Sequence, residues 1–183
     1  MERTRLVDAA VPGLGRGHAD RGRDDRQFCR EGTPRFGWWQ RGAAAQAIGR
    51  SRGGRTTKIH AICDRIGRLL VFALSPGNVA DITMAPELLA AAPASAMFLA
   101  DQGYDARAFR QSLVVRGARA VIPNNPTRKH PHPFDPHPYR MRNAIERMFC
   151  QIKDWRRVAT RYDKLARNFA SAVALVAAIL WWT

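Results

Sequence analysis

One carboxylate stands where a catalytic group would be expected. Asp101 directly follows a short apolar run at residues 96–100, which reads as a buried strand. In a sheet flanked by helices, ligands and catalytic groups usually lie at the carboxyl ends of the strands. Asp101 is therefore a candidate for catalysis or for ligand binding.

A second carboxylate belongs to a polar stripe on a predicted helix at residues 139–157. Four residues form the stripe: Tyr139, Arg142, Glu146 and Lys153. At about 100° per residue they lie within about 60° of one another, and apolar residues fill the neighbouring arc. The stripe thus lies at the edge of a core. Because Arg142 and Glu146 are four residues apart, a solvated face with helix-spaced ion pairs fits the spacing as well.

The elements that would position these residues alternate along the chain. We expect a hairpin of strands at 58–63 and 69–74, helices at 80–92 and 105–116, short strands at 96–100 and 118–122, and final helices at 139–157 and 165–182. Residues 123–138 form a loop rich in Pro, His and Asn. Residues 1–45 differ, with nine Arg, no Lys and no sustained periodicity. The sequence predicts one α/β domain at 46–183, preceded by a segment without native structure.

Charge favours a polyanionic partner. Thirty Lys and Arg against fifteen Asp and Glu give a formal net charge of +15, which suits DNA, although a GC-rich genome also produces Arg-rich chains. The longest apolar run, at 169–182, spans 14 residues, fewer than the roughly 20 that cross a bilayer. Cys29, Cys63 and Cys150 indicate neither disulfides nor zinc. We expect a cytoplasmic protein with no membrane partner.

Several motifs together resemble one enzyme family. The stripe has the spacing Y-x2-R-x3-E-x6-K, and Asp101 lies in the segment A-D-Q-G-Y-D at residues 100–105. Residues 49–54 read G-R-S-R-G-G, and residues 160–165 read T-R-Y-D-K-L. This pattern resembles the IS-four and IS-five groups of DDE insertion-sequence transposases. The resemblance covers roughly residues 46–183.

The resemblance implies a ribonuclease-H-like mixed sheet with helices on both faces, in agreement with the order of elements above. It implies two Mg²⁺ ions held by three carboxylates for phosphodiester transfer. Asp101 and Glu146 match the second and third carboxylates. Residues that would contact DNA are Tyr139, Arg142, Lys153, Arg50, Arg52 and Lys58. The partners implied are the DNA ends of the insertion sequence and the target DNA, so the protein would associate with the nucleoid. Assembly into a homo-oligomer is an open possibility.

The first carboxylate of the family has no counterpart here. It belongs to a strand resembling I-D-S-x-V-V-R-A-H-Q; Asp24 and Asp25 stand near its place, but residues 21–26 lack the apolar alternation of a strand. Reverse translation of residues 24–40, read one nucleotide later, permits M-I-D-S-S-V-V-R-A-H-Q-D-S-A-G-G-K. We therefore hypothesise that residues 1–45 are translated in a shifted frame and that the sheet lacks its first strand.

These features predict a DNA transposase whose present copy is inactive. Two alternatives stay open: a DNA-binding product without catalysis, and a nuclease that works with two carboxylates. The loop residues His130, His132 and His137 fit a solvated loop better than a metal site, because prolines between them keep the chain extended.

Overall fold

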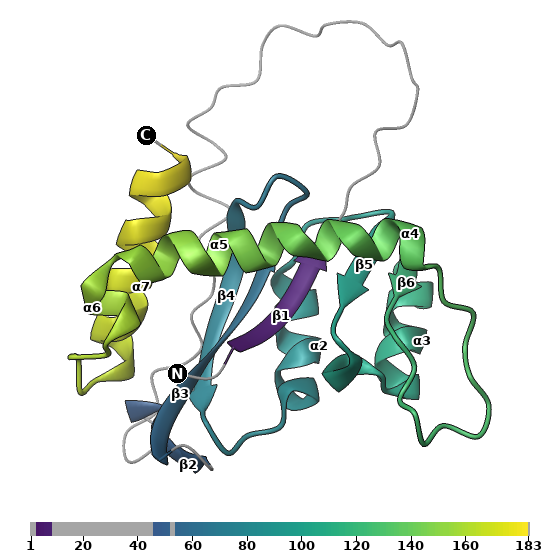
Figure 1. Ribbon diagram of the computed structural model, residues 1–183, viewed down its shortest axis with the longest axis horizontal. Helices are drawn as coiled ribbons and strands as arrows, with labels where there is room; N and C mark the ends of the chain where they lie inside the picture. Colours follow the sequence, from purple (N-terminus) through teal and green to yellow (C-terminus); the bar gives the residue numbers. More distant parts are fainter. Residues whose placement is uncertain (1–2, 9–45, 52–53, 183) are drawn as a thin grey trace, which may run out of the picture.

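The computed structural model describes residues 3–8, 46–51 and 54–182. The predicted shifted segment, apart from residues 3–8, lies outside these residues, as do Asp24, Asp25 and the predicted DNA contact Arg52. The described part is a mixed α/β structure, as expected (Figure 1).

A long hairpin forms one half of the sheet. Strand β3 (Gly54–Cys63) pairs antiparallel with β4 (Leu69–Pro76), and the short β2 (Gly49–Ser51) pairs antiparallel with the start of β3. Asp64 shapes the hairpin turn, since its Oδ1 accepts hydrogen bonds from the backbone N–H groups of Ile66 and Arg68. Gly67 takes a φ of +93°, which a glycine adopts without steric cost. The predicted hairpin is confirmed.

The other half contains β5 (Met97–Ala100) and β6 (Arg119–Val121), which pair in parallel. Between the halves lies β1 (Arg3–Asp8), giving the order β2-β3-β1-β5-β6, with β4 on β3 (Figure 1). The sequence predicted a segment without native structure at residues 1–45, and residues 3–8 of it form a strand; the shifted reading frame stays a prediction. Two adjacent strand edges expose rows of N–H and C=O groups, and an extended segment satisfies them almost regardless of its side chains.

The direction of β1 fixes which residues it brings near Asp101. β1 runs parallel to β3 and antiparallel to β5, with Leu6 opposite Ala100 and Asp8 opposite Phe98. Asp8 therefore lies beside Phe98, which precedes Asp101 by three residues, or about 10 Å along the strand. The carboxyl end of β1 points away from the end of β5 that carries Asp101.

Helices cover both faces of the sheet. On one face α2 (Asp81–Ala91) and α3 (Arg107–Val115) pack against Ile62, Phe98 and Ala100; on the other, the carboxy-terminal helices pack against Ala61, Cys63 and Leu99. Neighbouring residues of β3 and β5 therefore serve opposite layers, as the period of two requires. This two-sided burial explains the apolar composition of both strands.

The carboxy-terminal part crosses the sheet as a nearly continuous run of helical turns (Figure 1). It contains α4 (Pro136–Tyr139), the 3-10 turn η3 (Arg140–Arg142), α5 (Asn143–Asp154) and the short α6 (Arg156–Ala159). Helix α7 (Ala166–Trp181) ends the described chain. The helix predicted at 139–157 is thus present but tightened at 140–142 and broken after 154. Within the described residues, no helix has the length and apolarity that a bilayer crossing demands.

Candidate active site

Asp101 lies at the exit of a fully apolar strand. The four residues of β5 are buried, and Asp101 continues in extended conformation before the 3-10 turn η2 (Gln102–Tyr104) bends the chain away. Its side chain is 31% exposed. The end of a buried strand thus presents a partly solvated carboxylate.

Glu146 is placed by the amphipathic character of α5. The apolar side of that helix is buried in the core and comprises Ala144, Ile145, Met148, Phe149 and Ile152. Glu146 lies on the margin of this side, with its side chain 36% exposed. The stripe predicted from the sequence therefore borders the core at the edge of the sheet.

A single guanidinium joins the two carboxylates. Arg142 Nη1 lies 3.3 Å from Asp101 Oδ1, and Arg142 Nη2 donates a hydrogen bond to Glu146 Oε1. Burial alone would lower the pKa of Arg142, but its hydrogen bonds to Tyr139 and Glu146 and the charge of Asp101 raise it above the ordinary value. Arg142 therefore stays positively charged, and its cation lies between residues far apart in the chain.

Tyr139 completes this group. Its hydroxyl accepts a hydrogen bond from Arg142 Nη1 at 3.1 Å and donates to Asp101 Oδ1 at 3.4 Å. Burial raises the pKa of Tyr139, so the hydroxyl stays protonated and able to donate. The Arg142 guanidinium also lies over the Tyr139 ring, 5.6 Å from its centroid. Three residues of the predicted stripe thus converge with Asp101.

Asp105, which the sequence did not single out as a site residue, holds the neighbouring loop in place. Its carboxylate accepts from Arg110 Nε at 2.8 Å, Arg128 Nε at 2.9 Å and the Asn125 backbone N–H at 2.7 Å. Burial opposes ionisation, but these three hydrogen bonds lower the pKa of Asp105 overall. The loop also carries Phe134, whose ring packs edge-on against Tyr139 at 5.3 Å. Asp105 therefore anchors the loop from which Phe134 packs against Tyr139.

Lys58 takes a different place from the one expected of a DNA contact. It is 8% exposed, and its Nζ donates to Asp81 Oδ1 at 2.8 Å and to the Val79 carbonyl. The ammonium is used inside the fold, where it holds the start of α2 against β3. Because a buried and paired cation does not reach a DNA backbone, we leave Lys58 out of the DNA-contacting set proposed below.

The other predicted DNA contacts lie apart from the carboxylates. Lys153 is partly buried on α5, two turns beyond Glu146, and Arg50 is exposed on β2. Both stay predictions. A buried polar pair lies on the β3–β4 hairpin, where His60 Nε2 lies 2.7 Å from Ser75 Oγ. In the strand register His60 faces Ala73 and Ser75 faces Lys58, so the contact runs diagonally between the two strands.

The donor set does not suit two divalent cations. No group of three or more Asp, Glu, His or Cys side chains able to hold a metal ion is found among the described residues. Asp101 and Glu146 supply two carboxylates, and the Arg142 guanidinium lies between them. The strand register keeps the backbone of Asp8 away from Asp101. The described part of the chain therefore lacks a third carboxylate for the Mg²⁺ site that the sequence predicts.

Comparison with known proteins identifies the family of this chain. The family model described as "Transposase DDE domain" matches residues 98–183, which include Asp101 and Glu146. The chain is 37% identical over 129 residues to "Putative transposase for insertion sequence element IS6501" of Brucella ovis, a match that covers 69% of this chain and 98% of the relative. No solved structure matches the chain. The chain therefore belongs to the DDE transposases, a family that acts on DNA.

Proposed function

We propose that this chain is the catalytic-core portion of an insertion-sequence transposase of the IS-four and IS-five type, with a ribonuclease-H-like fold. Its parent activity is Mg²⁺-dependent cleavage of donor DNA at the element ends and transfer of those ends into target DNA. The observation that carries the proposal is the convergence of Asp101, Glu146 and Tyr139 on Arg142. Two carboxylates from distant segments, at the rim of a core and beside a cation, form the kind of site that phosphodiester chemistry uses.

We propose further that the present copy is inactive. Phosphodiester transfer with two metal ions needs a set of carboxylates that bridges both ions, and the described residues offer only two carboxylates at this place. The strand beside β5 runs antiparallel to it and carries Asp8 toward the opposite end. A shifted reading frame in residues 1–45 accounts for both features.

The remaining residues still suit DNA binding. Arg142 and Tyr139 offer a cation and a hydroxyl beside the carboxylates, and Lys153 and Arg50 extend the basic surface. The second candidate function is therefore a non-catalytic product that binds DNA, or binds its full-length relative, and interferes with transposition. The net charge of +15 supports DNA binding, which both candidate functions require.

Strand-transfer and nicking assays separate these functions. The substrate is a supercoiled plasmid that carries the element with its flanking DNA, assayed with Mg²⁺ and with Mn²⁺. We expect binding that weakens with salt, without cleavage. Robust turnover that Asp101→Ala abolishes would overturn the inactive-copy proposal and favour a nuclease with two carboxylates. Turnover that Asp101→Ala leaves intact would remove Asp101 from the site.

A repaired chain tests the origin of the defect. Residues 1–45 are replaced by the protein sequence of the shifted frame, and the control carries the same replacement with Asn in place of the restored aspartate. We expect cleavage from the repaired chain only. Because the segment supplies a strand as well as a carboxylate, a single Asp introduced into the present chain should not restore activity. A nucleotide sequence whose shifted frame encodes no I-D-S-like segment would refute the frameshift.

A further inference from the structure

A second basic region lies at the other end of α5 from Tyr139. The segment 153–167 carries six cationic residues against Asp154 and Asp163, and they are Lys153, Arg156, Arg157, Arg161, Lys164 and Arg167. Two aromatic side chains stand among them, Trp155 at 40% exposure and Tyr162 at 61%. Cations interleaved with solvent-facing aromatic rings are typical of surfaces that bind single-stranded nucleic acid.

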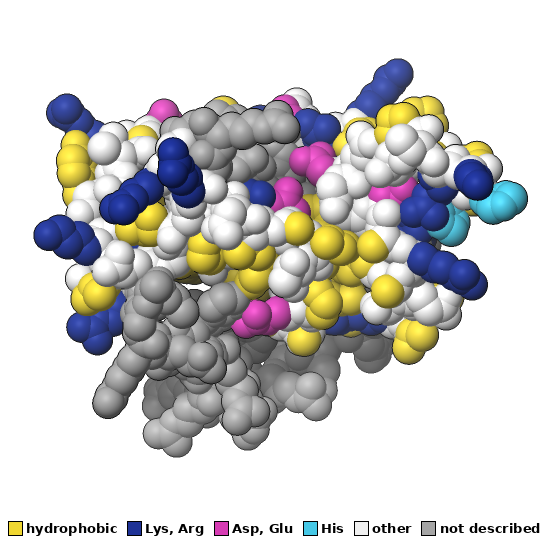
Figure 2. Space-filling view, turned by 90° about the horizontal axis from the view of Figure 1, so that it is seen from below, with side chains coloured by type: hydrophobic (Ala, Val, Ile, Leu, Met, Phe, Trp, Pro, Cys, Tyr) yellow, Lys and Arg dark blue, Asp and Glu magenta, His cyan; other side chains and the backbone are white. Residues whose placement is uncertain are grey.

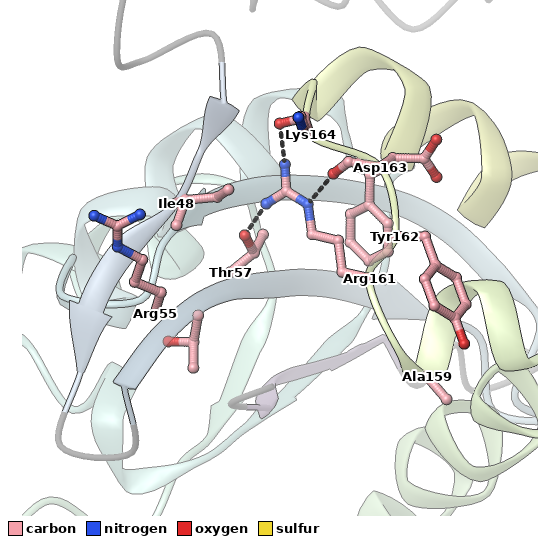
Figure 3. Close-up of a pocket in the computed structure, with 10 residues that line it drawn as sticks. Ile48, Arg55, Thr57, Ala159, Arg161, Tyr162, Asp163 and Lys164 are labelled. Carbon is pink, nitrogen blue, oxygen red and sulfur yellow. Dashed lines mark hydrogen bonds between the residues drawn. The ribbon is translucent and has the colours of Figure 1, made fainter.

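A pocket opens in this region, between the start of β3 and the segment that joins α6 to α7 (Figure 3). Its volume is about 310 Å³, and its lining includes Arg55, Thr57, Arg161, Tyr162 and Lys164. This size is at the lower end of the range for small-molecule sites, about 300–1,000 Å³, and it suits one nucleotide rather than a duplex. Figure 2 shows that Lys and Arg side chains gather toward the ends of the face it displays.

Arg161 builds the wall of the pocket. Its guanidinium donates to the carbonyls of Asp163 and Lys164 at 2.9 and 3.2 Å, to the Ala47 carbonyl at 3.3 Å and to Thr57 Oγ1. Figure 3 shows the side chain crossing from the α6–α7 segment to Thr57 on β3. Because its donors are used within the protein, Arg161 holds the pocket open and leaves ligand contacts to other side chains.

The acidic side chain in the pocket lining is paired within the protein. Asp163 is the acid in the lining, and Arg157 engages both of its carboxylate oxygens, at 3.0 and 3.2 Å. Arg55 and Lys164 are exposed on opposite sides of the pocket. Two cations on the rim could bind a phosphate, and the solvent-facing Tyr162 ring could stack on a base.

On the proposed DNA-processing function, we propose that this pocket binds one nucleotide of an unpaired DNA strand. Arg55 and Lys164 contact its phosphate, and the Tyr162 ring stacks on its base. Helices α5 and α6 lie between Glu146 and the pocket, whose lining includes Ala159 at the end of α6. The pocket thus lies apart from the carboxylates, where it would receive a strand that has separated from its complement.

Fluorescence anisotropy of the full chain tests this pocket. The probes are a fluorescein-labelled blunt duplex and the same duplex with a single-stranded thymidine tail. We expect Tyr162→Ala to weaken binding of the tailed duplex by about five- to 100-fold and to leave the blunt duplex almost unchanged. Tyr162→Phe keeps the aromatic face and should retain wild-type affinity. Thermal unfolding of each variant checks that the exposed substitution leaves the fold intact.

A charge-matched pair tests the phosphate contact. Lys164→Gln should reduce the salt dependence of tailed-duplex binding by about 0.7 in the slope of log K against log salt, as loss of one single-strand phosphate contact requires. Lys129→Gln removes an exposed cation on a distant loop, and it should change the binding of the tailed duplex and of the blunt duplex by the same amount. Equal effects of the two Gln variants, or equal losses on both probes in Tyr162→Ala, would overturn the pocket and leave the proposed function standing. Failure of the wild-type chain to bind either probe would overturn both.

Discussion

Arg142 lies 3.3 Å from Asp101 across the gap between helix and sheet, and the same guanidinium bonds to Glu146 one turn along its own helical run. Two carboxylates this close would repel each other, and the cation between them offsets that repulsion. The guanidinium lies between the two carboxylates, where a divalent cation would bind if both were its ligands, so we expect arginine and metal to compete for this place.

Arg142→Ala tests that competition. We expect a loss of no more than about 1 kcal/mol at neutral pH, since all three side chains are about one-third exposed and solvent screens their charges. Added Mg²⁺ or Mn²⁺ should raise the melting temperature of the variant more than that of the wild type. Arg119→Ala breaks an exposed ion pair with Asp135 and is the matched control. An equal metal response in wild type and Arg142→Ala would contradict the expectation.

Asp105→Asn should destabilise the fold strongly. The Asp105 side chain is 1% exposed and pairs with the buried Arg110 and the partly exposed Arg128, so the substitution leaves both guanidinium groups without their anion. Removal of one partner from a buried pair costs about 3–5 kcal/mol. Urea unfolding measures the loss. Asp64→Asn, in the hairpin turn, breaks a partly exposed pair with Arg68 and should cost less; a smaller loss for Asp105→Asn than for Asp64→Asn would argue against Asp105 as an anchor.

Because of His60, we expect the free energy of unfolding to fall in mild acid. Burial lowers its pKa from 6.5 to about 4, Lys58 adds to this and Asp81 opposes it. The folded state thus favours neutral histidine, and the resulting stability is complete above about pH 6.5 and disappears as the pH falls toward 4. The difference between the two pKa values corresponds to about 3 kcal/mol.

Unfolding free energies measured between pH 7 and pH 4 check this expectation for His60. His60→Gln should flatten the pH dependence in this window, whatever its effect on stability at neutral pH. His130→Gln, on the exposed loop, is the control and should keep the wild-type slope. An unchanged slope in His60→Gln would show that another group causes the acid sensitivity.

Arg161→Lys should be nearly as harmful as Arg161→Ala. The guanidinium reaches acceptors on two segments at once, including the Ala47 and Asp163 carbonyls, and a lysine ammonium does not reproduce that planar fork. Loss of these contacts should cost about 1.5–3 kcal/mol and lower the melting temperature by several degrees. Differential scanning calorimetry measures the change. A Lys variant as stable as the wild type would assign the wall of the pocket to other contacts.

Much of the local structure was predictable because periodicity is a property of neighbouring residues. The β-forming residues at 58–63, followed by a turn, predicted β3, and the spacing of Tyr139, Arg142 and Glu146 predicted one stripe on a helix. The 3-10 turn at 140–142 was not visible in the sequence, and the three residues still face Asp101 because the helical run continues through it.

Tertiary structure decided what each side chain meets. The sequence alone placed Asp101 at the end of a strand and Glu146 on a helix, but only packing of α5 across the sheet brought both to Arg142. Lys58 was expected on the surface and is buried, because the residue facing it comes from the start of α2, whose position no local pattern encodes.

Strand β1 shows most clearly how sequence and tertiary structure contribute differently. The sequence of residues 3–8 has no strand signal strong enough to assign it, and unpaired backbone groups on β3 and β5 recruit it nonetheless. Backbone pairing depends little on side chains, so its partner and direction follow from the surrounding sheet. The sequence by itself determined the types and spacing of the reactive residues, and the tertiary structure decided their neighbours, because contacts between distant segments depend on how the whole chain packs.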